Sequence, residues 1–270
     1  MPDGRVKIGN SLKFELLNGG SMTNETADIR RRVAEACRVL GRLDLTKAAT
    51  GHVSARLPGT DHILIRARGP AELGVRYTEE EQVVEVDMNG KLVNADSEGL
   101  EVPIEVFIHT AVYQSRPEVM SVIHVHPPTV MLFSICDTPL LPLYGAYDPG
   151  SAQIAIDGIP TYDRSILIST PELGRDLSKA MGRSCTCVMR GHGITTAATS
   201  IEEAALYAIY INELADINYR ARMLGAPRPI SQEDQDVFRL MGERAKKSTP
   251  GKPGPREAAL WRYYVALTDS

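Results

Sequence analysis

A chain of 270 residues with 43% hydrophobic side chains can bury a sizeable core, and we expect one large domain. Its net charge is only −4 and its 30 basic residues are dispersed, which argues against nucleic acid as a partner. The sequence has no 18-residue apolar stretch and no signal-peptide core at its N-terminus. We therefore expect a cytoplasmic protein with no membrane contact and a small-molecule partner.

The N-terminal part predicts an arm, a helix and then a set of short strands. Residues 1–22 are rich in Gly, Asn and Ser and are expected to form the arm. Apolar residues recur at helical spacing over 24–43, behind a cap at Thr23 or Asn24. Asn89-Gly90 predicts a hairpin, because both residues tolerate positive φ, so the sheet should be at least partly antiparallel. The predicted strands span residues 51–57, 62–66, 83–87 and 91–93.

The remaining chain alternates between helices and strands. A helix is predicted over 103–115, with Pro103 in its first turn. Further predicted elements are a strand over 119–125, a helix over 171–181, a buried strand over 185–189 and a long helix over 201–224. This order indicates a layered α/β domain spanning residues 23–245. Residues 246–255 predict a flexible linker to an aromatic segment that packs on the core or on a neighbouring subunit, so 246–270 form a separate tail.

Three histidines carry the strongest chemical signal. In a strand, alternate side chains share a face, so His124 and His126 can present two imidazoles to one ion. His192 lies between Gly191 and Gly193. A lone histidine is more often a surface or core residue, but this spacing favours a metal site. Imidazoles with a carboxylate suit zinc, manganese, iron or cobalt, and residue type does not choose among them.

The predicted helix over 103–115 supplies a carboxylate. Glu105 and His109 lie four residues apart, so both can face the strand that carries His124 and His126. The neighbours of Glu105 are apolar, and a carboxylate in such surroundings usually has a partner. It could move a proton while a metal stabilises an enolate, and metal-dependent hydrolysis fits the same ligands. His109 is either a substrate or second-layer contact or a core histidine.

Five blocks together resemble the class II aldolase and adducin family in order and spacing, over roughly residues 25–225. The blocks are Gly51 to Ser54, Glu105 to His109, Tyr113 to Pro117, His124 to His126 and Arg190 to Gly193. The resemblance implies a three-layer α/β/α fold with a central, mainly antiparallel or mixed sheet, and a homotetramer. It also implies a divalent metal on His124, His126 and His192, with Glu105 as the catalytic acid/base.

Two departures from the family's aldolases point to the substrate. Sugar-phosphate aldolases of this family carry Asn and a small hydroxyl residue where this chain has His52 and Arg68. A guanidinium and an imidazole shrink a phosphate cradle and suit a carboxylate. The pattern resembles the family's decarboxylase branch, which acts on hydroxylated aromatic dicarboxylates. The predicted substrate contacts are Arg68, His52, Ser54, Gly69 and His109; Arg66 is equally well explained as a solvated strand-end charge.

We accordingly predict a carboxy-lyase that removes the 4-carboxylate of 3-hydroxy-2-methylpyridine-4,5-dicarboxylate, a compound of vitamin B6 degradation. Mn²⁺ is the preferred metal, with Zn²⁺ or Co²⁺ as alternatives, and no organic cofactor is needed. The competing hypotheses are a 4,5-dihydroxyphthalate-type decarboxylase, a sugar-phosphate aldolase, and a non-catalytic scaffold like the adducin head domain. The sequence leaves open whether Tyr263 or Tyr264 enters a neighbouring active site.

Overall fold

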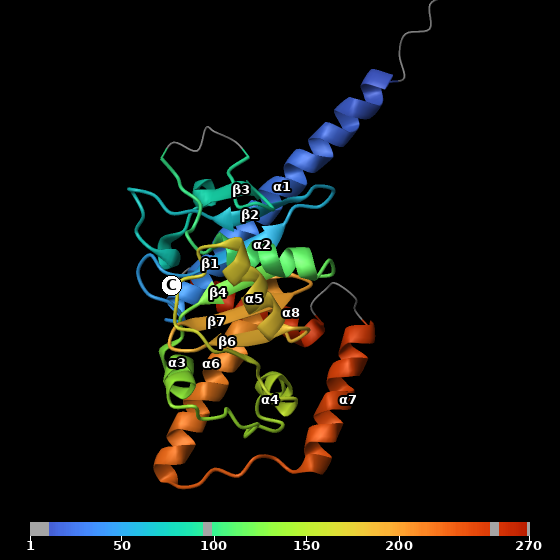
Figure 1. Cartoon of the computed structure of the whole chain (residues 1–270). Helices are drawn as coiled ribbons and strands as arrows, with labels where there is room; N and C mark the ends of the chain where they lie inside the picture. The colour runs from blue at the N-terminus through green and yellow to red at the C-terminus, as the bar shows by residue number, and fades with distance from the viewer. Residues whose placement is uncertain (1–10, 94–98, 249–253, 269–270) are drawn as a thin grey trace, which may run out of the picture.

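The computed structural model describes residues 11–93, 99–248 and 254–268. At its centre is a seven-stranded sheet in the order β3-β2-β1-β4-β7-β6-β5, with helices on both faces (Figure 1). The strands are β1 His52–Arg56, β2 His62–Arg66, β3 Val83–Asp87, β4 Ser121–Val125, β5 Thr161–Tyr162, β6 Thr186–Met189 and β7 Gly193–Ala198. All neighbouring strands run antiparallel except β5 and β6, which are parallel. The predicted three-layer fold with a mixed sheet is confirmed.

Eight α-helices and two short 3-10 helices surround this sheet in the described residues. The helices are α1 Ser11–Arg42, α2 Val106–Ser115, α3 Pro128–Ile135, α4 Pro149–Ile156, α5 Pro171–Met181, α6 Ile201–Leu224, α7 Gln232–Ser248 and α8 Pro255–Ala266, with 3-10 turns at Val75–Tyr77 and Glu80–Gln82. Helices α1 and α6 pack on one face of the sheet and α2 and α5 on the other. The sequence therefore folds into one sheet between two helical layers.

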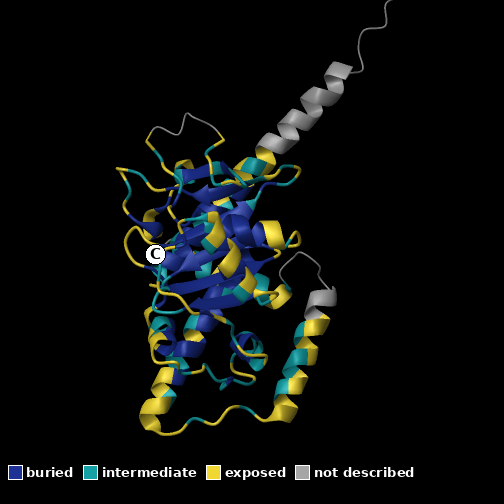
Figure 2. Ribbon diagram, in the orientation of Figure 1, coloured by how far each residue is buried: buried dark blue, intermediate teal, exposed yellow. Residues whose placement is uncertain are grey.

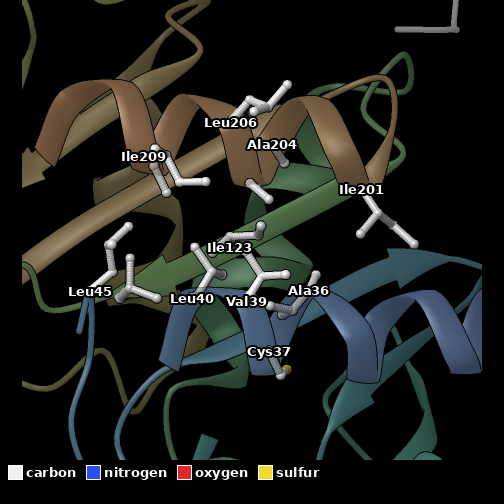
Figure 3. Close-up of a cluster of buried hydrophobic side chains, with 14 of the residues drawn as sticks. Ala36, Cys37, Val39, Leu40, Leu45, Ile123, Ile201, Ala204, Leu206 and Ile209 are labelled. Carbon is white, nitrogen blue, oxygen red and sulfur yellow. The ribbon is translucent and has the colours of Figure 1, made fainter. Parts of the chain in front are cut away.

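The strands divide their side chains between two apolar clusters. On β2, Leu64 belongs to the cluster under α1 and α6, while Ile63 and Ile65 belong to the cluster under α2 and α5. Strand β4 does the same with Ile123 and Val122, because successive side chains leave a strand on opposite faces. Figure 3 shows the first cluster around Ile123, between α1 and α6. The buried interior follows the sheet, whereas much of α7 is exposed (Figure 2).

Helices α2 and α5 approach each other closely, and this contact fixes the helical layer that carries Glu105. A Cβ on Gly174 of α5 would lie 2.4 Å from the carbonyl oxygen of Phe107 on α2, so only glycine fits there. The hydroxyls of Ser115 and Ser178 lie 2.6 Å apart across the same interface. This packing holds the N-terminal end of α2, where Glu105 lies, against the sheet.

Several predicted boundaries are wrong. Helix α1 begins at Ser11, so Thr23 and Asn24 lie inside it and do not cap it. A Thr or Asn can act as an N-cap only where its own backbone lies outside the helix, and here the helix already begins before both residues. Helix α2 begins at Val106, with Glu105 as its N-cap residue, and Pro103 lies ahead of the first turn.

Other differences lie in the second half of the chain and near the hairpin. Residues 91–93 do pair with β3, through an isolated bridge between Val86 and Leu92, but they form no regular strand. Helix α7 continues through Lys246 to Ser248, so the predicted linker begins later; its residues 249–253 lie outside the described part. Five elements were not predicted: α3, α4, β5 and β7, which are short, and α7, which is longer.

No helix among the described residues is both long and apolar enough to cross a membrane.

Candidate active site

The first two histidines of the site lie at the C-terminal end of β4. His124 is the penultimate residue of β4 and pairs in register with His52 of β1 and Thr195 of β7. Its Nδ1 lies 2.9 Å from the carbonyl oxygen of Ile194, which can only accept, so Nδ1 carries the proton and Nε2 keeps a free lone pair. His126 follows the strand, and its Nε2 lies 2.8 Å from the Nε2 of His124. The predicted shared face of the two imidazoles is confirmed.

The turn between β6 and β7 brings the third histidine to the same place. The ring centroid of His192 lies 4.9 Å from that of His124 and 5.1 Å from that of His126. A Cβ on Gly193 would lie 2.4 Å from the carbonyl oxygen of Val125 and 2.6 Å from Cδ2 of His126. Gly193 is therefore required for β7 to approach β4 closely enough to hold His192 there.

Glu105 faces these histidines from the opposite side. It is the N-cap residue of α2, yet its carboxylate makes no capping hydrogen bond. Instead Oε1 accepts a hydrogen bond of 2.8 Å from the backbone N–H of Ile168. Oε2 lies 3.4 Å from Nε2 of His192 and 3.6 Å from Nε2 of His124. Only 6% of the residue is exposed, so the fold keeps this carboxylate buried and aimed at the imidazoles.

The four side chains of Glu105, His124, His126 and His192, hereafter the His₃Glu cluster, could hold a metal ion. Each offers one ligand atom, and these atoms lie within 4.8 Å of one another. Ligand atoms about 2.1 Å from a tetrahedral ion are roughly 3.4 Å apart, close to the separations that Glu105 makes. Both ring nitrogens of His192 are buried without a hydrogen-bond partner among the described residues, a costly state that a cation would relieve. The donor set therefore fits a divalent ion.

His124 and His126 have lowered pKa values. Burial, reinforced by the neighbouring His192, lowers the pKa of His126 to about 4. Burial and the surrounding histidines also lower the pKa of His124 and of His52 well below the ordinary histidine value. Neutral imidazole is the form that binds metals, so His124 and His126 need not lose a proton before an ion enters.

Behind the cluster lies a buried row of polar side chains, which contains three of the predicted substrate contacts. Nδ1 of His52 is 2.7 Å from Nε2 of His109, and Nδ1 of His109 is 2.7 Å from Oγ of Ser54. Oγ of Ser54 is also 2.8 Å from the hydroxyl of Tyr113. Ser54 and His109 are fully buried, which is at odds with direct substrate contact by either, whereas His52 keeps 7% of its surface exposed. Their partners lie on adjacent elements, so side-chain spacing on α2 alone could not show this row.

The structure separates the two arginines that the sequence offered as carboxylate ligands. Arg66 is buried, donates to Thr78 and to the backbone oxygens of Ala49 and Gly51, and also pairs with Glu72. It is thus a structural group that fixes the loops around it, and the alternative of a solvated charge is wrong. Arg68 lies at the surface, where its guanidinium is 2.6 Å from the Glu101 carboxylate.

Gly69 and Arg190 make packing and ion-pair contacts with the surrounding protein. A Cβ on Gly69 would come within 3.0 Å of the Leu100 side chain, so this turn needs a small residue. Arg190 forms ion pairs with both Asp137 and Asp163, away from the ring of His192 that follows it in the sequence. The sequence analysis missed the backbone groups of Ile168 and Ile194 that orient Glu105 and His124, because backbone groups leave no residue-type signal.

Comparisons with known proteins place this site in a family. The sequence matches the class II aldolase and adducin N-terminal domain over residues 31–219. A solved aldolase II superfamily protein from Pseudomonas syringae has the same fold, with a TM-score of 0.77, 20% identity, and coverage of 91% of this chain and 93% of that one. The chain belongs to the class II aldolase and adducin family.

Two curated relatives narrow the relationship. The chain is 35% identical over 247 residues to the 3,4-dihydroxyphthalate decarboxylase of Terrabacter sp. (strain DBF63), covering 91% of this chain and 99% of that protein. It is 35% identical over 202 residues to the 3,4-dihydroxyphthalate decarboxylase of Arthrobacter keyseri, covering 74% of this chain and 81% of that protein. These relationships put the chain on the decarboxylase branch of the family and support a carboxy-lyase.

Proposed function

We propose that this protein is a metal-dependent carboxy-lyase that removes one carboxylate from a hydroxylated aromatic dicarboxylate without oxidation. One observation carries the proposal: a His₃Glu cluster, buried at Glu105 and His124 and half-buried at His126 and His192, in a chain that is 35% identical to a 3,4-dihydroxyphthalate decarboxylase over 91% of its length. Because both relatives carry the dihydroxyphthalate name, we rank 3,4-dihydroxyphthalate ahead of the pyridine dicarboxylate as the substrate.

The two substrates share one chemical arrangement. In 3,4-dihydroxyphthalate and in 3-hydroxy-2-methylpyridine-4,5-dicarboxylate, three consecutive ring carbons carry a hydroxyl, a carboxylate and a second carboxylate. In its keto tautomer such a hydroxyl places a carbonyl β to the middle carboxylate, which makes that carboxylate the one that leaves as carbon dioxide. In 4,5-dihydroxyphthalate no hydroxyl adjoins a carboxylate, so it lacks this arrangement and ranks lowest of the three.

The His₃Glu cluster would hold a divalent ion through His124, His126 and His192, with Glu105 beside them. Such an ion supplies a Lewis acid that stabilises negative charge developing on a substrate oxygen. The donor set favours no single metal. The preference for Mn²⁺, with Zn²⁺ or Co²⁺ as alternatives, rests on the family resemblance.

Glu105 is proposed to deliver the proton that the ring carbon takes up. As the keto tautomer forms, the substrate hydroxyl loses its proton and the carbon that bears the middle carboxylate gains one from Glu105. When the bond between that carbon and the carboxylate then breaks, the electron pair passes toward the carbonyl oxygen, carbon dioxide departs, aromaticity returns and the oxygen regains a proton. Oε2 of Glu105 is the carboxylate oxygen turned toward the histidines, while Oε1 is anchored by the Ile168 N–H. This anchoring holds the proton-carrying oxygen in one direction.

The retained carboxylate is proposed to meet His52, with Arg68 as a second ligand. Arg68 is tied to Glu101 at the surface, so it reaches a substrate only if that pair opens. An exposed ion pair contributes at most about 1 kcal/mol, so opening it costs little. Gly69 stays a proposed contact through its backbone only, since it has no side chain.

The test is carbon dioxide release from manganese-loaded protein given 3,4-dihydroxyphthalate, the pyridine dicarboxylate, 4,5-dihydroxyphthalate or a ketose 1-phosphate, each separately. We expect release from the first, and a lower or absent rate from the third. Release from the pyridine alone would make the pyridine dicarboxylate the substrate, as the sequence predicted, and would leave the decarboxylation reaction unchanged. Cleavage of the sugar phosphate alone would overturn the decarboxylase proposal.

Metal content and assembly complete the proposal. The purified protein is expected to retain about one divalent ion per chain, and a protein that retains none under any loading condition would revive the non-catalytic alternative. The homotetramer stays a prediction, which light scattering after size exclusion tests. Whether Tyr263 or Tyr264 reaches a neighbouring site depends on that assembly.

A further inference from the structure

A row of four buried polar side chains leads from the protein interior to the candidate active site. Tyr113 and His109 come from α2, and Ser54 and His52 from β1 beneath it. Tyr113 is 2% exposed, Ser54 and His109 are not exposed at all, and His52 is 7% exposed. His52 is therefore the end of the row that reaches the site, where its ring centroid lies 5.2 Å from that of His124.

Hydrogen positions along this row follow from counting donors and acceptors. The Tyr113 hydroxyl lies 2.8 Å from Oγ of Ser54, and its other neighbour is the backbone of Val122, whose N–H can only donate. Tyr113 therefore donates its hydrogen and Ser54 accepts. A buried hydroxyl that failed to donate would carry a desolvation cost. The hydrogen of Ser54 is then left for one of two acceptors, Nδ1 of His109 at 2.7 Å or the carbonyl oxygen of Val122 at 3.3 Å.

The distances favour His109 as the acceptor. A separation of 2.7 Å is typical of a hydroxyl donor, whereas N–H donors usually stand about 2.9–3.0 Å from oxygen, and 3.3 Å is a weak contact for either. If Nδ1 of His109 accepts from Ser54, a neutral His109 carries its proton on Nε2. That N–H then donates to Nδ1 of His52 across 2.7 Å. A neutral His52 must in turn carry its own proton on Nε2.

We propose that Ser54 and His109 act as positioning residues that hold His52 in its Nε2-protonated tautomer, so that His52 donates a hydrogen bond to a carboxylate oxygen of the substrate. This inference rests on the proposed function for the identity of the substrate. Among the described residues, Nε2 of His52 has no hydrogen-bond partner of its own. The row thus leaves one donor free at the edge of the site.

A neutral donor has a specific advantage at this position. The divalent ion that the His₃Glu cluster would hold already supplies the positive charge expected to act on the leaving carboxylate. Burial lowers the pKa of His109 to about 3, so this ring stays neutral and donates a single proton to Nδ1 of His52. The reverse orientation, in which Ser54 donates to Val122, would make Nε2 of His52 an acceptor suited to a phenolic hydroxyl. The two orientations therefore predict different ligands for the same ring.

The direct test is the ¹⁵N spectrum of histidine-labelled protein by solid-state nuclear magnetic resonance, in the metal-free and the zinc-loaded forms. His52→Gln and His109→Gln spectra assign the two rings. We expect protonated Nε2 and unprotonated Nδ1 for both His52 and His109. A protonated Nδ1 on His52 in the wild-type protein would overturn the proposal.

Three variants separate tautomer control from packing. Ser54→Ala removes the donor to Nδ1 of His109, so the ring can instead carry its proton on Nδ1 and donate to the Val122 carbonyl, which lies against that ring. His52 should switch to protonated Nδ1, and KM for 3,4-dihydroxyphthalate should rise about tenfold, the effect of losing one hydrogen bond to a charged group. Tyr113→Phe, the matched control, leaves the Ser54 donor in place and should keep the wild-type His52 spectrum. Unchanged His52 spectrum and KM in Ser54→Ala would refute the proposal.

His109→Gln provides the rescue measurement, because a glutamine amide can still donate to Nδ1 of His52. It should retain the Nε2-protonated His52 signal and most of the substrate affinity, whereas His109→Met should lose both. Equal losses in the two variants would mean that His109 only packs. The spectra need no turnover, so a protein with the expected tautomers that releases no carbon dioxide would contradict the proposed function and not this inference.

Discussion

At the scale of single residues, the most informative position is Glu105. The side chain at a helix N-cap, usually Ser, Thr, Asp or Asn, normally accepts from backbone N–H groups of the first turn. Here the Glu105 carboxylate makes no such bond and instead joins the Ile168 N–H to the imidazoles of His124 and His192. Losing the cap costs the helix about 1 kcal/mol. The structure thus gives up local stability to hold a carboxylate among histidines, which is typical of a functional group.

Glu105→Gln should separate binding from chemistry. The amide oxygen can still accept from Ile168, so the fold and the three imidazoles are kept, but the side chain no longer transfers a proton. We expect metal content near that of the wild type and turnover lower by roughly 10²-fold or more. Inductively coupled plasma analysis and carbon dioxide release measure the two quantities, with Glu172→Gln on the exposed face of α5 as the control. Undiminished turnover with metal retained would contradict the role of Glu105.

His109 predicts an acid-sensitive fold. Its pKa in the folded protein is about 3, while an unfolded histidine titrates near 6.5. The unfolded chain therefore binds more protons between these values, so the stability is fully present above about pH 6.5 and is lost as the pH falls toward 3. Between pH 6.5 and pH 5 this one group accounts for about 2 kcal/mol.

Urea unfolding of the metal-free protein at pH 7.5 and pH 5 checks this expectation. His109→Gln should reduce the difference in unfolding free energy between the two pH values. His62→Gln, at the start of strand β2, is the control for loss of a histidine elsewhere in the sheet. An equal acid effect in wild type and His109→Gln would show that other groups dominate.

At the scale of elements, the turn between β6 and β7 determines whether the third histidine reaches the other two. Gly193→Ala would place a methyl group 2.4 Å from the Val125 carbonyl oxygen and 2.6 Å from His126, forcing β7 away from β4. We expect metal affinity to fall at least tenfold, since His192 moves with the strand, and stability to fall by about 1–3 kcal/mol.

Gly145→Ala is the matched control for this substitution. Its added methyl would meet only Phe238, at ordinary contact distances of 3.8 and 3.9 Å. Isothermal titration with Zn²⁺ and thermal unfolding should therefore give values near the wild type. Wild-type zinc affinity in Gly193→Ala would contradict the proposed link between this close approach and the site.

At the scale of the whole molecule, one sheet is shared by both apolar clusters, and the last helix joins one of them. Trp261 of α8 is 9% exposed and packs in the cluster under α1 and α6, and Arg42 at the end of α1 donates to the carbonyl oxygen of Leu267. These contacts attach α8 to the rest of the fold.

The single tryptophan makes this attachment measurable. If α8 unfolds together with the sheet, tryptophan fluorescence and far-ultraviolet circular dichroism should report the same urea midpoint. An earlier fluorescence transition would mean that the terminal helix detaches as a separate unit. Trp261→Phe, followed by circular dichroism alone, controls for an effect of the probe and should keep a similar midpoint.

Local sequence determined the elements and the chemical type of the site. Strands β2 and β3 and helices α5 and α6 have the predicted bounds, because alternation and helical periods, with a capping Thr170 or Ser200, are written over adjacent residues. The spacing of His124 and His126 put two imidazoles on one face for the same reason. Elements such as α3 and β7 were not predicted, since PTVMLFSI and GITTAA show neither a helical period nor an alternation of apolar and polar residues.

Only the tertiary structure decided which groups act on one another. Arg66 and Arg68 look equivalent in sequence, yet one is buried under loop carbonyls and the other forms a surface pair. Glu105 and His109 lie four residues apart, yet they face different partners because α2 begins only after Glu105. Such contacts join residues far apart along the chain, and their geometry depends on how the layers pack. The sequence by itself therefore determined a class II aldolase-like fold and its chemical groups, and the packing of the layers determined their directions.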